Sequence, residues 1–245
     1  MEPMHAAGFA GFLAQTDAVA KGILVILLLM SLATWYLILT KSISALFARR
    51  RGGLFLDRFW NSASIGAVQS HLEEHHPDEP FSHLAWHAII ASRHHQRHGA
   101  GRLDEAGSQS EFLTRAMRRV LDEDTARAEA GLTVLASVGS TAPFIGLFGT
   151  VWGVYHALVA IGVAGQGTLD KVAGPVGEAL IMTALGLAVA IPAVLAYNAF
   201  VRTNRLLLAR LDGFAHDLYA VLTTGSHVGD PASVVPLKPA AKGAA

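Results

Sequence analysis

The chain has 245 residues, no cysteine, and equal numbers of basic and acidic side chains, 19 of each. Hydrophobic residues make up 52% and charged residues only 16%, whereas an ordinary soluble domain is about 25% charged. The balanced charge argues against nucleic-acid binding, and the lack of cysteine excludes disulfide scaffolds, iron–sulfur clusters and cysteine nucleophiles. We expect a membrane protein that contacts lipids, binds no nucleic acid, cofactor or metal, and is not an enzyme.

The charges avoid three stretches of the chain. Residues 22–40, 131–169 and 172–201 together hold 88 residues and one formal charge, Glu178, whereas the other 157 residues hold 37. About 20 apolar residues are enough to cross a bilayer as a helix. We therefore predict an all-α membrane protein with three transmembrane helices, over 21–41, 131–163 and 173–201.

The remaining segments set the orientation. The 41–130 loop and the 202–245 tail hold 17 lysines and arginines, whereas residues 1–21 and the 162–171 turn hold two. Because basic residues favour the cytoplasmic side, we expect the N-terminus outside and the C-terminus in the cytoplasm. The outer segments are then 1–20, a surface helix or a frayed terminus, and the turn 164–172. The cytoplasmic segments are a helical loop domain over 42–130, a helix over 202–224 and a disordered tail over 225–245.

Helical patterns continue outside the predicted spans. The loop domain contains helical runs over 54–72 and 109–130, and the second run is expected to continue into the second span as one long helix. The third span is expected to continue as a helix to about Leu222, with an apolar side made of Leu206, Leu207, Leu211, Phe214 and Leu218. The long second and third helices would therefore protrude into the cytoplasm.

The loop domain is rich in histidine. Three pairs have the i, i+4 spacing that places two imidazoles on one helix face: 71/75, 83/87 and 94/98. His71 and His75 also match the H-x-x-E-H pattern of some metalloproteases. A five-residue match arises easily by chance in such a loop, so a solvated surface with weak adventitious metal affinity is the favoured interpretation. A membrane metalloprotease is the alternative.

Small residues recur along the second and third spans. They let a neighbouring helix approach closely, so we expect these helices to pack on helices of this chain, of other copies or of another subunit. Two prolines would each loosen a backbone hydrogen bond within their span. The predicted helix-packing residues are Gly146, Gly149, Gly153, Gly186, Pro143 and Pro192.

Glu178 is the one charge in the three charge-poor stretches 22–40, 131–169 and 172–201. Placing a carboxylate in a bilayer costs about 2.5–3.5 kcal/mol on insertion scales, so a functional role is the default hypothesis. The alternative is that Glu178 lies near the interface and is stabilised by the dipole of its helix N-terminus. Thr183 lies about 140° around the helix from Glu178, so the two would cooperate only through a neighbouring helix. Thr150, taken alone, is expected to bond to its own backbone.

Two long motifs point to a family. GSTAPFIGLFGTVWG over 139–153 and GPVGEALIMTALGLAVAIPAVLAYN over 174–198 closely resemble the ExbB branch of the MotA/TolQ/ExbB proton-channel superfamily. The resemblance implies a homo-pentameric ring in the inner membrane of a Gram-negative bacterium, with outer segments in the periplasm. The second and third spans would line a central pore that holds the transmembrane helices of ExbD. By motif, Glu178, Thr150 and Thr183 correspond to the proton-pathway and pore-lining residues.

The resemblance also implies the activity. With ExbD, which brings the proton-carrying aspartate, such a ring energises TonB for outer-membrane import of siderophores, haem and vitamin B12. A TolQ-like subunit that works with TolR in outer-membrane integrity is the alternative, although the Ser-Thr-Ala-Pro run at 140–143 is more similar to ExbB. A purely structural scaffold for partner helices is a third hypothesis, under which Thr150 and Glu178 would tolerate residues of similar size.

Overall fold

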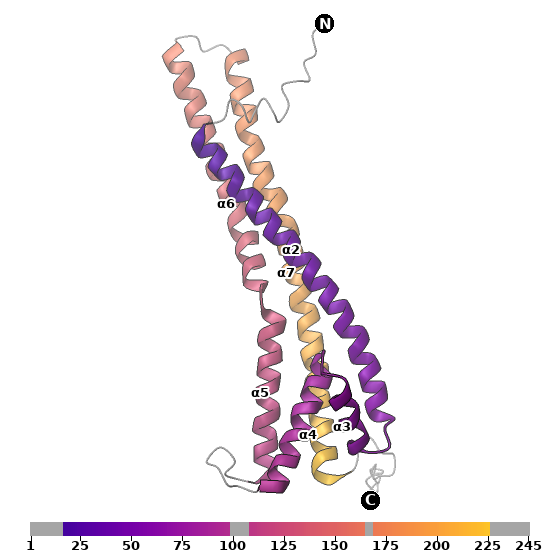
Figure 1. The fold of residues 1–245 in the computed structure, drawn as a ribbon. Coiled ribbons are helices and arrows are strands. Elements are labelled where there is room, and N and C mark those ends of the chain that lie inside the picture. Colours follow the sequence, from indigo (N-terminus) through magenta and orange to yellow (C-terminus); the bar gives the residue numbers. More distant parts are fainter. Residues whose placement is uncertain (1–16, 99–107, 165–168, 226–245) are drawn as a thin grey trace, which may run out of the picture. The chain divides into compact units, whose positions relative to one another are not determined.

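The computed structural model describes residues 17–98, 108–164 and 169–225, and these residues form helices and no strands (Figure 1). Three helical stretches are long and apolar enough to cross a membrane: Ala18–Trp60, Gln109–Val163 and Ala179–Thr224. The all-helical class and the three candidate spans are therefore confirmed. The predicted surface helix near the N-terminus and the predicted disordered tail fall outside the described residues. The helices are α2 (Ala18–Trp60), α3 (Ile65–Glu74), α4 (Pro80–His98), α5 (Gln109–Glu129), α6 (Leu132–Ala164) and α7 (Leu169–Thr224).

The chain divides into two compact units, each of which combines segments far apart in sequence. The first, here called the membrane unit, comprises Met1–Ser44 and Glu129–Thr203. It holds the first part of α2, all of α6 and most of α7. The second, here called the bundle unit, comprises Ala45–Ala128 and Asn204–Ala245. It contains α3, α4 and α5 with the last turns of α2 and α7.

The membrane unit has a small core of its own, formed where α2, α6 and α7 meet. Its fully or nearly fully buried side chains include Leu27, Leu135 and Met182. Many large apolar side chains stay outside this core: Leu32 of α2 is 59% exposed and Phe144 of α6 is 70% exposed. Such surface is unfavourable in water, so lipid or other helices must cover it in the working protein.

The bundle unit has a larger core, and its apolar side chains come from all five of its helical segments. Leu84 and Ile89 of α4, Leu113 of α5, and Leu211 and Leu218 of α7 are almost completely buried. Leu206 was predicted on the same apolar side of α7, but it is 60% exposed. Its position one residue before Leu207 turns it by about 100° away from the buried stripe.

A carboxylate begins α4. Oε2 of Glu79 accepts the backbone N–H of Phe81 at 2.9 Å and Oε1 accepts that of Ser82 at 2.6 Å. Pro80 occupies the first helical position, where a missing N–H costs nothing. Burial raises the pKa of Glu79 above its ordinary value, and the nearby Asp124 adds to this, although the N–H donors act in the opposite direction. Glu79 therefore caps a helix from inside the core of the bundle unit.

The prediction of one helical run over 54–72 is wrong, because the structure interrupts it between residues 60 and 65. Helix α2 ends at Trp60 and α3 begins at Ile65. Between them, Ser64 is extended, and its hydroxyl accepts the backbone N–H of Ala67 at 3.2 Å, which is an N-cap. Asn61 also turns back and donates to the carbonyl of Asp57 at 2.7 Å. The polar residues at this point compete with helix hydrogen bonds, and they divide one amphipathic run into two helices.

The predicted single helix through 109–163 is also wrong. Helix α5 ends at Glu129, α6 begins at Leu132, and Gly131 between them has a φ of +78°. That left-handed conformation ends a helix and favours glycine. Gly131 also packs closely against α2, since an added Cβ would lie 2.9 Å from Cδ2 of Leu37. The second span is therefore a helix with its own beginning.

Candidate functional site

Helices α6 and α7 lie side by side in the membrane unit (Figure 1), and two glycines bring their backbones into contact. A Cβ added to Gly146 would lie 2.6 Å from the carbonyl oxygen of Met182 and 3.0 Å from Cα of Gly186. A Cβ added to Gly186 would lie 2.6 Å from the carbonyl oxygen of Ala142. There is thus no room for any side chain at either position.

The other predicted packing residues flank this contact. The Cβ positions of Gly149 and Gly153 face Met182 and Ala179 of α7, at nearest distances of 3.1 and 3.0 Å. Pro143 lies inside α6 and Pro192 inside α7, and both are half-buried. Their role in packing stays a prediction.

The predicted pore residues Thr150 and Thr183 meet next to this contact. Thr150 is buried and Thr183 half-buried, and their hydroxyl oxygens lie 2.5 Å apart. The hydroxyl of Thr150 also lies 3.0 Å from the carbonyl oxygen of Ala179 on α7 and 3.2 Å from that of Gly146 on its own helix. The expected bond to its own backbone is therefore present, together with two contacts to α7.

These contacts limit the direction of the hydroxyl protons. A hydroxyl has one proton to donate and can accept twice, so Thr150 cannot donate to all three neighbours. If Thr150 donates to a carbonyl, Thr183 must donate to Thr150, which gives a directed chain from Thr183 through Thr150 to Ala179 or Gly146. Rotating both hydroxyls reverses the donor in the central bond. Two hydroxyls in such contact can orient or pass a proton, although neither titrates near neutral pH.

Glu178 lies in α7, one residue before Ala179. Its side chain is outside the part of the chain that the structure describes, so its role stays a prediction. The neighbouring helix that could join Thr183 to other groups is α6, because Thr150 of α6 contacts Thr183.

Asp17 is a residue of this region that the sequence analysis missed. Its carboxylate accepts the backbone N–H of Ala20 at 2.8 Å, and so caps α2, and it accepts the indole N–H of Trp152 on α6 at 2.6 Å. These two hydrogen bonds, the backbone one first, lower the pKa of Asp17. The signal was available, since an aspartate directly before an apolar run is a typical N-cap. Its partner in α6 had no such signal.

We expect Asp17→Ala to lower the free energy of unfolding of the membrane unit by about 1 kcal/mol at neutral pH, the usual cost of a lost N-cap. Because the pKa of Asp17 is lowered in the folded state, its contribution is present above the ordinary aspartate pKa and disappears as the pH falls through the lowered value. Unfolding in detergent at neutral and strongly acidic pH measures this. Trp152→Phe, which keeps the cap, should cost less. An equal effect of Asp17→Ala at both pH values would contradict the prediction.

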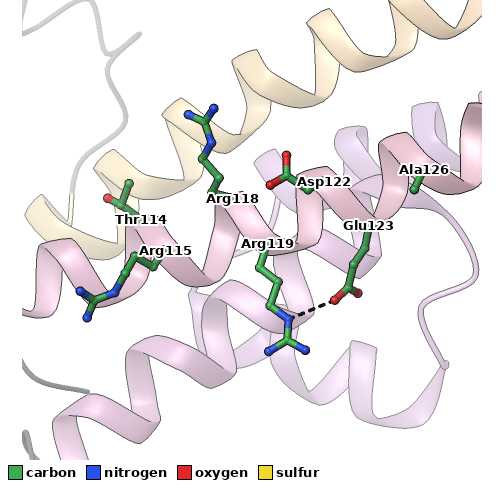
Figure 2. Close-up of a pocket in the computed structure, with 7 residues that line it drawn as sticks. All are labelled: Thr114, Arg115, Arg118, Arg119, Asp122, Glu123 and Ala126. Atoms are coloured by element: carbon green, nitrogen blue, oxygen red, sulfur yellow. Dashed lines mark hydrogen bonds and ion pairs between the residues drawn. The ribbon is translucent and has the colours of Figure 1, made fainter. Parts of the chain in front are cut away.

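A shallow hollow lies along α5 in the bundle unit (Figure 2). Its lining consists of seven residues of this one helix, and most are charged. Arg119 donates to Glu123 one turn on at 3.1 Å, an exposed pair of the usual helix-surface kind. All the lining residues that the structure describes belong to α5, so among them the hollow lacks the convergent polar groups of a small-molecule site.

Comparison with known proteins identifies the family. A model described as the MotA/TolQ/ExbB proton channel family matches residues 83–212. A Xanthomonas campestris pv. campestris protein named biopolymer transport protein ExbB is 44% identical over 213 residues, which cover 86% of this chain and 84% of the relative. An ExbB of Neisseria meningitidis is 43% identical over 206 residues, with coverage of 84% and 93%. A Pseudomonas aeruginosa Tol-Pal system protein TolQ is 31% identical over 220 residues, with coverage of 89% and 94%.

The matched region includes α6, the part of α7 that contacts α6, and every predicted site residue. It covers more than half of the chain, and the ExbB relatives extend the similarity over most of the remainder. The chain is therefore a membrane protein that belongs to the MotA/TolQ/ExbB proton channel family.

Proposed function

We propose that the protein is the ring-forming subunit of an ExbB-type motor in the inner membrane of a Gram-negative bacterium. Driven by the proton-motive force, the ring works with ExbD to energise TonB for outer-membrane import of siderophores, haem or vitamin B12. The relatives named ExbB are 43–44% identical, whereas the relative named TolQ is 31% identical, which favours the ExbB system over the Tol system.

The observation that carries the proposal is the contact between the hydroxyls of Thr150 and Thr183. It lies among apolar side chains of α6 and α7, where a polar pair has few alternative partners. One face of this pair would border the pore of a homo-pentamer, in which the second and third spans line the channel. There the hydroxyls would hold the proton-carrying aspartate of ExbD during each protonation cycle.

Glu178 would supply the one carboxylate that this chain contributes within its spans. A carboxylate near the outer end of the pore attracts protons, and it would favour their transfer to the aspartate of ExbD. The sidedness of the basic residues supports a periplasmic N-terminus and a cytoplasmic C-terminus, with protons passing inward. The bundle unit would then lie in the cytoplasm.

The function is tested by complementing a strain that lacks its own ExbB. The chain, expressed with its own ExbD, should restore growth on a siderophore as the sole iron source. The opposite result would overturn the ExbB assignment in favour of the Tol system. In that case the chain would fail to restore siderophore uptake to the strain without ExbB, but would restore detergent resistance to a strain without TolQ.

The hydroxyl pair is tested by Thr150→Val, which keeps the shape of the side chain and removes the hydroxyl. We expect uptake to fall roughly 100-fold, which is the lower limit of the usual rate contribution of a positioned proton-transfer group. The amount of assembled protein should stay unchanged. Thr150→Ser keeps the hydroxyl and should retain most uptake. Equal uptake by the valine and serine variants would exclude a role for the hydroxyl.

Glu178 is tested in the same assay by Glu178→Gln and Glu178→Ala. If the carboxylate acts directly, both variants lose uptake although they still assemble with ExbD. Full uptake by both variants would exclude the direct role of the carboxylate. The hypothesis for the Thr150 and Thr183 hydroxyls would still be tested separately by the Thr150 variants.

A further inference from the structure

The end of α3 in the bundle unit carries three metal-binding side chains. One donor atom from each of His71, Glu74 and His75 lies within 4.8 Å of the other two. His71 and Glu74 belong to the last turn of the helix, and His75 is its C-cap, with its backbone N–H bonded to the carbonyl of His71 at 3.0 Å. The helix therefore fixes all three backbones.

We propose that His71, Glu74 and His75 form a binding site for a divalent transition metal ion of the Zn²⁺ class. Two imidazoles and one carboxylate are a donor set that zinc accepts, with a fourth position left to water. Donors around a tetrahedral zinc lie roughly 3.3–3.6 Å apart, given bonds of about 2.0–2.2 Å. Since Glu74 and His75 are exposed, side-chain rotation can close the set without moving α3. This proposal departs from the expectation that the chain binds no metal.

The imidazole rings of His71 and His75 already lie close together. The ring centroids of His71 and His75 lie 4.6 Å apart and the rings are tilted by 35°.

Arg58 of α2 competes with a metal ion for one of the three ligands. Its guanidinium Nη1 lies 2.6 Å from Nε2 of His71, and a guanidinium can only donate. Nε2 therefore accepts, Nδ1 carries the proton, and the one free lone pair of His71 is the one that Arg58 occupies. A metal must displace Arg58 to bind. Because Arg58 is exposed, it can swing into solvent, and the metal and the arginine compete for one nitrogen atom.

The site differs from the pair formed by His83 and His87 in the same unit. His83 and His87 of α4 also have close rings, 4.7 Å apart, but Nδ1 of His83 is taken by Asp124 at 3.1 Å. Asp124 in turn accepts from Arg127 at 3.3 Å. The His83 ring is therefore held in a hydrogen-bond network around the buried Asp124. Only the α3 cluster combines three donors with solvent access among the described residues.

The test uses the full-length chain, purified in detergent without a histidine tag and titrated with Zn²⁺ in a calorimeter. We expect one tight site per chain, which weakens by at least about tenfold in His75→Ala and in Glu74→Gln. His216→Ala removes an exposed histidine elsewhere, on α7, and should leave the tight site unchanged. Arg58→Ala should tighten binding because it removes the competitor.

Several results would overturn the proposal. Binding that is weak, spread over many sites and unaltered in the His75 and Glu74 variants would mean adventitious metal only. An equal loss in His216→Ala would mean the same. Unchanged affinity in Arg58→Ala would overturn the assignment of Nε2 of His71 as the ligand atom. None of these readouts depends on siderophore uptake, so the metal site and the proposed motor function stand or fall separately.

Discussion

Gly186→Ala should separate α6 from α7 and lower the free energy of unfolding of the membrane unit by about 1–3 kcal/mol, the usual cost of overpacking. The added Cβ would lie 2.6 Å from the carbonyl oxygen of Ala142 and 3.0 Å from Cα of Gly146. These are backbone atoms, which cannot rotate away as a side chain does. The helices themselves must move, so the cost belongs in the upper part of that range.

The same substitution should also remove function. Thr183 lies three residues before Gly186 on α7, and its hydroxyl is 2.5 Å from that of Thr150. A hydrogen bond weakens steeply beyond about 3.2 Å, so a separation of 1 Å between the helices breaks the pair. Under the proposed function, Gly186→Ala therefore loses siderophore uptake, and it does so without changing either hydroxyl.

The chain offers graded controls for this prediction. Gly162 of α6 has nothing within 4 Å of an added Cβ, so Gly162→Ala should be neutral or slightly stabilising, because alanine favours helix by up to about 1 kcal/mol. Gly139→Ala meets Cγ2 of Val194 at 2.5 Å, but its nearest backbone neighbour is 3.4 Å away. Valine is stiff in a helix, yet a side chain yields more easily than two helix backbones, so this variant should fall between the other two. Thermal unfolding in detergent ranks the variants. A Gly186→Ala protein as stable as Gly162→Ala would refute the backbone contact.

The glycine contact also shows what could be predicted from sequence. The positions of the spans follow from the absence of charge, a property that each segment carries by itself. The small residues at 146 and 186 indicated that helices would approach there. Which glycine meets which could not be predicted, because that depends on the rotation and register of two helices. The meeting of Thr150 and Thr183, 33 residues apart, depends on the same two quantities.

The helix ends were missed for a different reason. Asn61, Ser64 and Gly131 are residue types that commonly end or begin helices, so the local signal was present. The apolar periodicity continues across both breaks, and periodicity cannot distinguish a continuous helix from two helices in succession. Local capping decides such cases, and at both breaks it overrides the longer apolar pattern.

Phe214→Ala should have the largest effect in the bundle unit, a loss of about 3–5 kcal/mol in its free energy of unfolding. Phe214 of α7 is 4% exposed. Its ring centroid lies 5.2 Å from that of Phe59, 5.8 Å from Phe81, 6.1 Å from Trp60 and 6.4 Å from Phe55. Three of these four contacts come from α2 and the fourth from α4, and all four are edge-to-face, the arrangement that aromatic rings favour.

Phe214 is costly to truncate because its neighbours cannot fill the space. The surrounding rings are rigid and belong to two other helices, so the cavity left by a benzyl group stays largely open. Leu206→Ala is the matched control on the same helix, since Leu206 is 60% exposed and should change stability by less than about 0.5 kcal/mol. Unfolding of the two variants in detergent, followed by near-ultraviolet circular dichroism of the aromatic residues, measures the difference.

Phe214→Ala also distinguishes a loss of uptake caused by unfolding from one caused by a defect in the proton pathway. The Thr150 and Thr183 pair belongs to the membrane unit and Phe214 to the bundle unit, so the variant leaves every group of the proposed proton pathway in place. Uptake should therefore fall only in proportion to the folded, assembled fraction, and growth at low temperature, where that fraction recovers, should restore it. Thr150→Val should show the opposite pattern: normal assembly and no rescue by temperature. If uptake in Phe214→Ala stayed low at full assembly, the bundle unit would have a direct part in the motor cycle.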